Sequence, residues 1–195
     1  MFIRDVKLKT RETHEILLAD VHLPVKMGHR DAEKVFGAPL KAQMAATNLG
    51  TVLSCDIRTR ASGAAVGVDI ALGLRDARDI ALRTVADMLE ALSAPFGSSI
   101  RLSEGIGDPI LFGVTEGLEL MVDTPAAPDA DARRELALTC HDALDQTGVS
   151  RGWDFRSDKT VFYFYGEDFA DMRARLDRTL KAIPRFQGVD IRRLA

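Results

Sequence analysis

Short stretches rich in apolar and β-branched residues, with some alternation of apolar and polar positions, recur along the chain and are typical of strands. They cover residues 51–57, 65–72, 117–123, 160–165 and 189–194, and the alternation is clearest at 117–123. Between them, apolar residues recur three and four positions apart near residues 80–92, 136–144 and 169–180, which places them on one side of a helix. Residues 98–103 and the stretch around Trp153 and Phe155 add two further predicted strands.

The order of these elements predicts the fold class. From Gly117 onward the order is strand, helix, strand, strand, helix, strand, which is the order of the ferredoxin-like unit. Residues 65–103 supply another strand, helix and strand, preceded by one more strand. We therefore predict an α+β fold of two ferredoxin-like-type strand-helix-strand modules, with antiparallel sheets covered by helices on one face.

The first fifty residues differ from this regular pattern. Residues 2–8 and 16–21 resemble two strands joined by a polar turn at 10–13, and residues 31–36 resemble a short helix that Gly37 and Pro39 end. We expect residues 1–50 to form an N-terminal hairpin or arm with a short helix. Residues 51–110 are then the first α+β module and residues 111–195 the second, ferredoxin-like module, together one compact domain.

Composition narrows the class of protein. The chain has 195 residues, of which 46% are hydrophobic and 28% charged, an ordinary globular balance. A formal net charge of -3 gives no general attraction to nucleic acid or to an anionic membrane. The apolar stretches are too short to cross a bilayer, and the first seven residues alternate apolar with charged residues, unlike a signal peptide. We expect a cytoplasmic protein with reduced thiols at Cys55 and Cys140.

No group of residues predicts catalysis, a cofactor or a metal site. Asp20 and His22 point the same way in a strand, but two ligands do not make a metal site. Residues 140–142 are Cys, His and Asp, yet consecutive helix residues diverge by about 100°. The loop 105–109 has two glycines but lacks the strand and helix of a dinucleotide site.

Carboxylates gather where helices are predicted to begin. There they accept hydrogen bonds from free backbone amides and complement the positive end of the helix. We expect this capping role for three clusters: Asp76 and Asp79; Asp129 and Asp131; and Glu167, Asp168 and Asp171.

The aromatic strand at residues 160–165 is the most informative feature for function. Exposed aromatic rings on a sheet form a surface that binds proteins or stacks on ligands. The possible binding surface consists of Trp153, Phe155, Phe162, Tyr163, Phe164 and Tyr165. The alternative is that a second sheet or the N-terminal arm buries this strand. The strand is nearly uncharged, which argues against an RNA-binding role.

Residues 160–172 combine an aromatic strand that ends in Tyr-Gly with an acidic helix start and a methionine. With residues 113–120, this stretch resembles the C-terminal ferredoxin-like α+β module of small bacterial proteins of uncharacterised function. The resemblance covers a third to a half of the chain. It implies a bacterial origin and transfers no functional residue.

Two classes of function remain. The first is a non-catalytic protein-binding protein, such as an immunity-type toxin inhibitor or a regulator, which suits the acidic balance and the missing catalytic motif. The second is a small-molecule-binding protein or enzyme with a pocket between the modules. We expect a protein partner, no nucleic acid or membrane, and a monomer or weak dimer.

Overall fold

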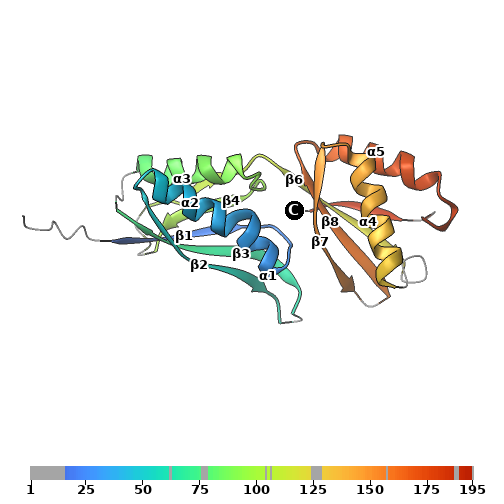
Figure 1. The fold of residues 1–195 in the computed structure, drawn as a ribbon, viewed down its shortest axis with the longest axis horizontal. Coiled ribbons are helices and arrows are strands. Elements are labelled where there is room, and N and C mark those ends of the chain that lie inside the picture. Colours follow the sequence, from blue (N-terminus) through green and yellow to red (C-terminus); the bar gives the residue numbers. More distant parts are fainter. Residues whose placement is uncertain are drawn as a thin grey trace, which may run out of the picture.

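The structure is a computed structural model that describes residues 16–61, 63–75, 79–103, 105, 107–123, 129–156, 158–186 and 189–194. Two modules lie side by side along the long axis of the molecule (Figure 1). The predicted strand 2–8, the turn 10–13 and the capping residue Asp76 lie outside the described residues.

The first module contains a five-stranded antiparallel sheet with the order β2-β3-β1-β4-β5. Its strands are β1 (Leu17–Leu23), β2 (Gly50–Thr59), β3 (Ala65–Leu74), β4 (Ser98–Leu102) and β5 (Ile110–Phe112). Strand β1 lies in the middle of this sheet, paired with both β3 and β4. The expected division is therefore corrected: residues 17–46 belong to the first module and are not an arm. The physical reason is burial: Val21 and Leu23 are fully buried, so β1 contributes a central row of side chains to the core.

One face of this sheet is covered by helices. They are α1 (His29–Ala32), the π-helical turn η1 (Glu33–Gly37), α2 (Ala38–Ala46) and α3 (Asp79–Ala91). The expectation that Gly37 and Pro39 end a short helix is wrong, because α1, η1 and α2 follow one another without a break. Gly37 and Ala38 keep right-handed helical backbone angles, so the chain continues from the π-helical turn through Pro39 into α2. Burial of Phe36 and Leu40 then outweighs the local helix-ending signals.

The second module has the ferredoxin-like order that the sequence predicts. Its elements are β6 (Glu116–Asp123), α4 (Ala130–Leu144), β7 (Gly148–Arg156), β8 (Lys159–Gly166), α5 (Phe169–Lys181), a 3₁₀ turn (Pro184–Phe186) and β9 (Asp190–Leu194). The four strands are antiparallel in the order β7-β8-β6-β9. The strand order of β1 to β4 is the same, so both modules have the ferredoxin-like topology, and the predicted α+β fold class is confirmed.

Helices α4 and α5 cover one face of the second sheet and form its own core. Fully buried residues from β6, β8 and both helices make up this core: Leu118, Leu120, Leu136, Cys140, Leu144, Phe162, Phe164, Met172, Leu176 and Leu180. The opposite face packs against the first module, because Met121, Val161, Tyr163 and Tyr165 belong to the first module's hydrophobic cluster. The second sheet is therefore covered on both faces.

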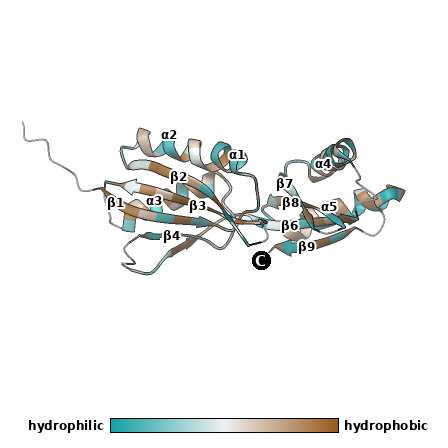
Figure 2. Ribbon diagram, turned by 90° about the horizontal axis from the view of Figure 1, so that it is seen from below, coloured by the Kyte–Doolittle hydropathy of each residue, from teal (hydrophilic) through white to brown (hydrophobic). Residues whose placement is uncertain are grey.

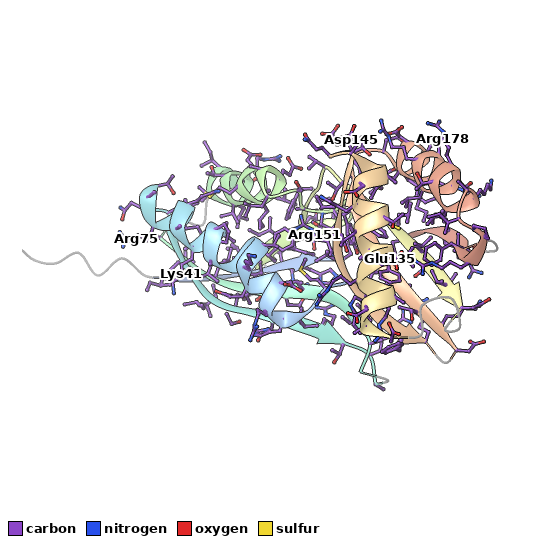
Figure 3. All side chains as sticks on the ribbon, turned by 45° about the vertical axis from the view of Figure 1, so that its right-hand side comes forward. Lys41, Arg75, Glu135, Asp145, Arg151 and Arg178 are labelled. Carbon is purple, nitrogen blue, oxygen red and sulfur yellow. The ribbon has the colours of Figure 1, made fainter. Side chains whose placement is uncertain are left out.

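Two chain segments hold the modules together at their junction. Pro95 pairs with Thr115 in a parallel bridge, and a Cβ at Gly113 would lie 2.1 Å from the carbonyl oxygen of Pro95. Only glycine permits this approach, and its φ of +129° is also unfavourable for other residues. Strand β9 belongs to the second module (Figure 2), and Leu194 at its end packs against the hydrophobic cluster of the first module. Arg151 reaches from β7 toward the first module, with its guanidinium 5.8 Å from the ring centroid of Phe36 (Figure 3).

Candidate functional site

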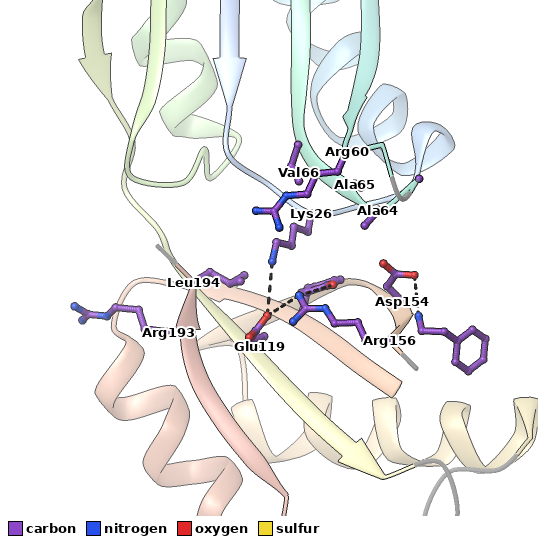
Figure 4. A pocket seen from close by; sticks show the side chains of 13 residues that line it. Lys26, Arg60, Ala64, Ala65, Val66, Glu119, Asp154, Arg156, Arg193 and Leu194 are labelled. Carbon is purple, nitrogen blue, oxygen red and sulfur yellow. Dashed lines mark hydrogen bonds and ion pairs between the residues drawn. The ribbon is translucent and has the colours of Figure 1, made fainter. Parts of the chain in front are cut away.

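A cleft of about 750 Å³ lies between the two modules (Figure 4). The first module contributes the loop after β1 and the turn between β2 and β3, and the second contributes the face of its sheet opposite α4 and α5. Its polar lining consists of Lys26, Arg60, Glu119, Asp154, Arg156 and Arg193, and its less polar walls include Val66, Phe155, Tyr163 and Leu194.

Glu119 is the centre of a polar network in this cleft. Its carboxylate oxygen Oε2 accepts a hydrogen bond of 2.9 Å from Arg156 and lies 3.6 Å from Nζ of Lys26. The Glu119 side chain is only 10% exposed. Because a buried carboxylate is stable only when it is paired, these two cations explain how Glu119 is accommodated among the apolar residues of β6.

Tyrosine hydroxyls extend the network on the same face of the second sheet. Arg156 also lies 3.4 Å from the hydroxyl oxygen of Tyr163. The backbone N–H of Lys26 donates a hydrogen bond of 2.9 Å to the hydroxyl of Tyr165. Burial raises the pKa of both phenols, so both keep their protons at neutral pH. The loop that carries Lys26 is thus fixed to the second module through its own backbone.

The charge of the cleft differs from that of the chain. Four cationic side chains line it against two carboxylates, whereas the whole chain has a formal charge of -3. Arg193 pairs with Glu116 at 2.9 Å, and Lys26, Arg60 and Arg156 still outnumber Glu119 and Asp154. Clefts with one sign of charge and low-dielectric walls attract ligands of the opposite sign. The chemistry of this cleft therefore suits a small anion.

The aromatic residues predicted as a binding surface separate into three groups. Phe162 and Phe164 lie under α4 and α5, whereas Tyr163 and Tyr165 face the first module, and all four are at most 5% exposed. These four do not form an exposed surface, because the first module covers the face opposite the helices. Of them, Tyr163 lines the cleft.

Trp153 and Phe155 are the two predicted residues that are exposed, at 48% and 52%. Their rings meet edge to face with centroids 5.0 Å apart, and the guanidinium of Arg133 lies 5.0 Å from each centroid. Both rings lie on β7, at the edge of the second sheet. They form a small aromatic patch outside the buried strand.

The sequence analysis missed Lys26, Arg60, Glu119 and Arg156. One signal was available for Glu119, which is a charged residue enclosed by Leu118, Leu120 and Met121. Such a residue on a strand predicts a buried ion pair. Nothing in the sequence identified Lys26 as its partner, because the two residues are far apart in the chain.

His22 takes part in a different cluster, on the open face of the first sheet. Its Nδ1 lies 2.8 Å from the Oδ1 oxygen of Asp69, whose other oxygen accepts a hydrogen bond of 2.8 Å from Nε of Arg58. This triad borders a second cleft of about 490 Å³ that Asp20 also lines. Among the described residues, no three His, Cys, Asp or Glu side chains are placed to hold a metal ion. Nor is any helix in this part of the chain long and apolar enough to span a membrane.

Comparisons with known proteins add little to this picture. No protein-family model matches the sequence, and no curated protein matches it. Among solved structures, the chain is similar to one described as "Putative Chlorite dismutase", with 12% identity over 93% of this chain and 96% of that chain and a TM-score of 0.28. A TM-score this low carries no argument about function, so the fold class stands on the strand order alone.

Proposed function

We propose that this protein binds a small anionic molecule, such as a carboxylate or a phosphate ester, in the cleft between its two modules. The observation that carries this proposal is the excess of cationic side chains in a cleft that both modules build. Lys26 and Arg60 come from the first module, and Arg156 from the second. This develops the alternative expected from the sequence, a pocket between the modules.

The arrangement suits recognition of a carboxylate or phosphate. Glu119 pairs with both Lys26 and Arg156, so these two cations have one positive charge more than the single carboxylate neutralises. An arginine fork gives directed hydrogen bonds to such groups. Val66, Tyr163 and Leu194 supply apolar walls for the carbon skeleton of the ligand.

Isothermal titration calorimetry tests the proposal with citrate, 2-oxoglutarate and inorganic phosphate. We expect at least one of them to bind, more weakly as the salt concentration rises. Arg60→Gln removes an exposed cation of the cleft and should weaken that binding about tenfold, or about 1.4 kcal/mol. Arg58→Gln is the matched control, because Arg58 lies two residues away and pairs with Asp69 on the open face of the first sheet.

If Arg60→Gln weakens anion binding and Arg58→Gln does not, the result supports binding in the cleft. If none of the three anions binds, or if the two variants weaken binding equally, the proposal is wrong.

Protein binding is the second candidate function, as the sequence analysis proposed for a regulator or immunity-type inhibitor. The exposed pair of Trp153 and Phe155 favours it, since aromatic residues are enriched at protein interfaces. A partner that wild-type protein captures from a native lysate, and that Trp153→Ser fails to capture, supports this role. Equal capture by both proteins counts against it.

A further inference from the structure

Lys26 presents its amine to the interior of the cleft from the loop that follows β1 (Figure 4). The side chain is 21% exposed, and Nζ lies 5.1 Å from the ring centroid of Tyr163. The carboxylate of Glu119 is 3.6 Å from the same nitrogen. The amine is therefore fixed beside a proton acceptor and faces space large enough for a small ligand.

The surroundings lower the pKa of this amine below that of an exposed lysine. Burial lowers the pKa of Lys26, and the positive charges of Arg156 and Arg60 lower it further, whereas Glu119 opposes them. These groups and the phenol of Tyr163 face Lys26 from β6, β7, β8 and the turn between β2 and β3. A lysine that is partly desolvated and lies near other cations is the kind that reacts with carbonyl carbons.

We propose that Lys26 forms an imine with an anionic aldehyde or ketone, of the 2-oxo acid class, bound in the cleft. This inference rests on the proposed function and adds the reactive group of the ligand. Arg60 and Arg156 hold the carboxylate of the ligand, which brings its carbonyl group next to the amine.

The chemistry is balanced without an oxidant or a reductant. The lone pair of the neutral amine attacks the carbonyl carbon, and the electron pair of the C=O bond moves onto oxygen. Glu119 accepts two protons in turn from the nitrogen and returns each of them to the oxygen, which leaves as water when the C=N bond forms. The net reaction joins one amine and one carbonyl group into one imine and one water molecule, and hydrolysis reverses it.

Reductive trapping tests this inference on the full chain. The protein is incubated with glyoxylate and sodium cyanoborohydride, and the modified peptides are mapped by mass spectrometry. We expect modification of Lys26 about tenfold faster than at the other lysines, because the bound anion is held next to the amine. Lys34, Lys41, Lys159 and Lys181 are internal controls in the same sample. Equal or slower modification at Lys26 overturns the inference.

Two further measurements keep the inference separate from the proposed function. Lys26→Arg keeps the positive charge but cannot form an imine, so it should still bind 2-oxoglutarate in calorimetry. Acetaldehyde, which carries no charge, should modify Lys26 with much less preference over the controls. If 2-oxoglutarate binds the wild-type cleft and no adduct is trapped at Lys26, the imine is wrong and anion binding stands. If no anion binds and no adduct forms, both proposals are wrong.

Discussion

Glu119 shows at the scale of single residues how the two modules are joined electrostatically. Lys26 of the first module and Arg156 of the second meet at the same carboxylate oxygen. A carboxylate that is this deeply buried is costly unless its partners remain, and the partners become costly if it is removed. The site and the module junction therefore depend on one side chain.

Replacing Glu119 with glutamine should lower the free energy of unfolding by about 1–3 kcal/mol, because Lys26 and Arg156 would be left without their shared anion. Urea denaturation measures this change. Asp123→Asn is the control on the same strand, since its ion pair with Lys159 is exposed and should contribute much less to stability. Equal effects of the two substitutions would contradict this account of Glu119.

Both cysteines are buried thiols in the folded protein. Burial raises the pKa of Cys55 to about 11 and that of Cys140 to about 12. We expect neither to react quickly with a thiol reagent such as DTNB at pH 8, and both to react in urea. Their contribution to stability is present below pH 9 and falls above it, because the unfolded thiols ionise first. Rapid reaction of either thiol in the native protein would contradict the buried position of that cysteine.

At the scale of elements, the capping role predicted for the carboxylates is confirmed at two helices. Asp129 accepts a hydrogen bond from the N–H of Ala132, and Asp168 accepts one from the N–H of Asp171. These bonds fix where α4 and α5 begin. The sequence was sufficient here because a cap depends on residues only three positions apart.

Asp168→Ala should lower the free energy of unfolding by about 1 kcal/mol, because the first turn of α5 loses its side-chain acceptor. Glu167→Ala is the matched control, one residue earlier and exposed, and should change it by less than about 0.5 kcal/mol. Chemical denaturation of both variants gives the comparison. A larger effect at Glu167 than at Asp168 would contradict the cap.

The sequence predicted helices and strands well where a local hydrophobic pattern defines them. It predicted them less well where contacts between distant segments decide the position of an element. The strands from residue 50 onward, apart from β5, and the helices α3, α4 and α5 agree closely with the sequence analysis. Strand β1 was predicted as a strand but placed in an arm, because its partners β3 and β4 are distant in the chain. The three-residue strand β5 was missed, since such a stretch contains too little periodicity.

At the scale of the whole molecule, the aromatic strand β8 explains why the modules pack as they do. Residues 160–166 are all buried, so this strand has no polar face. A run of this kind is typical of strands covered on both sides, but the sequence analysis left open whether the second face has a cover. The first module provides it through the cluster shared with Tyr163 and Tyr165. A pocket between the modules was expected as an alternative, but the residues that line the cleft could not be predicted, because they meet only after the modules pack.

The shared cluster predicts that the two modules unfold together. Trp153 is the single tryptophan, so its fluorescence reports the second module, while hydrogen exchange of the β1 and β3 amides reports the first. We expect the urea midpoints of the two probes to coincide. Two separate transitions would show that the contact between the modules contributes little to stability.

Anion binding in the cleft is tested most directly by an NMR titration of ¹⁵N-labelled protein with 2-oxoglutarate. The account predicts that chemical-shift changes appear in both modules at once, at the amides of Lys26, Arg60, Glu119 and Arg156. They should disappear when the salt concentration is raised, as expected for a charged ligand. Changes confined to the open face of the first sheet around His22 and Asp69, or no changes at all, would contradict it.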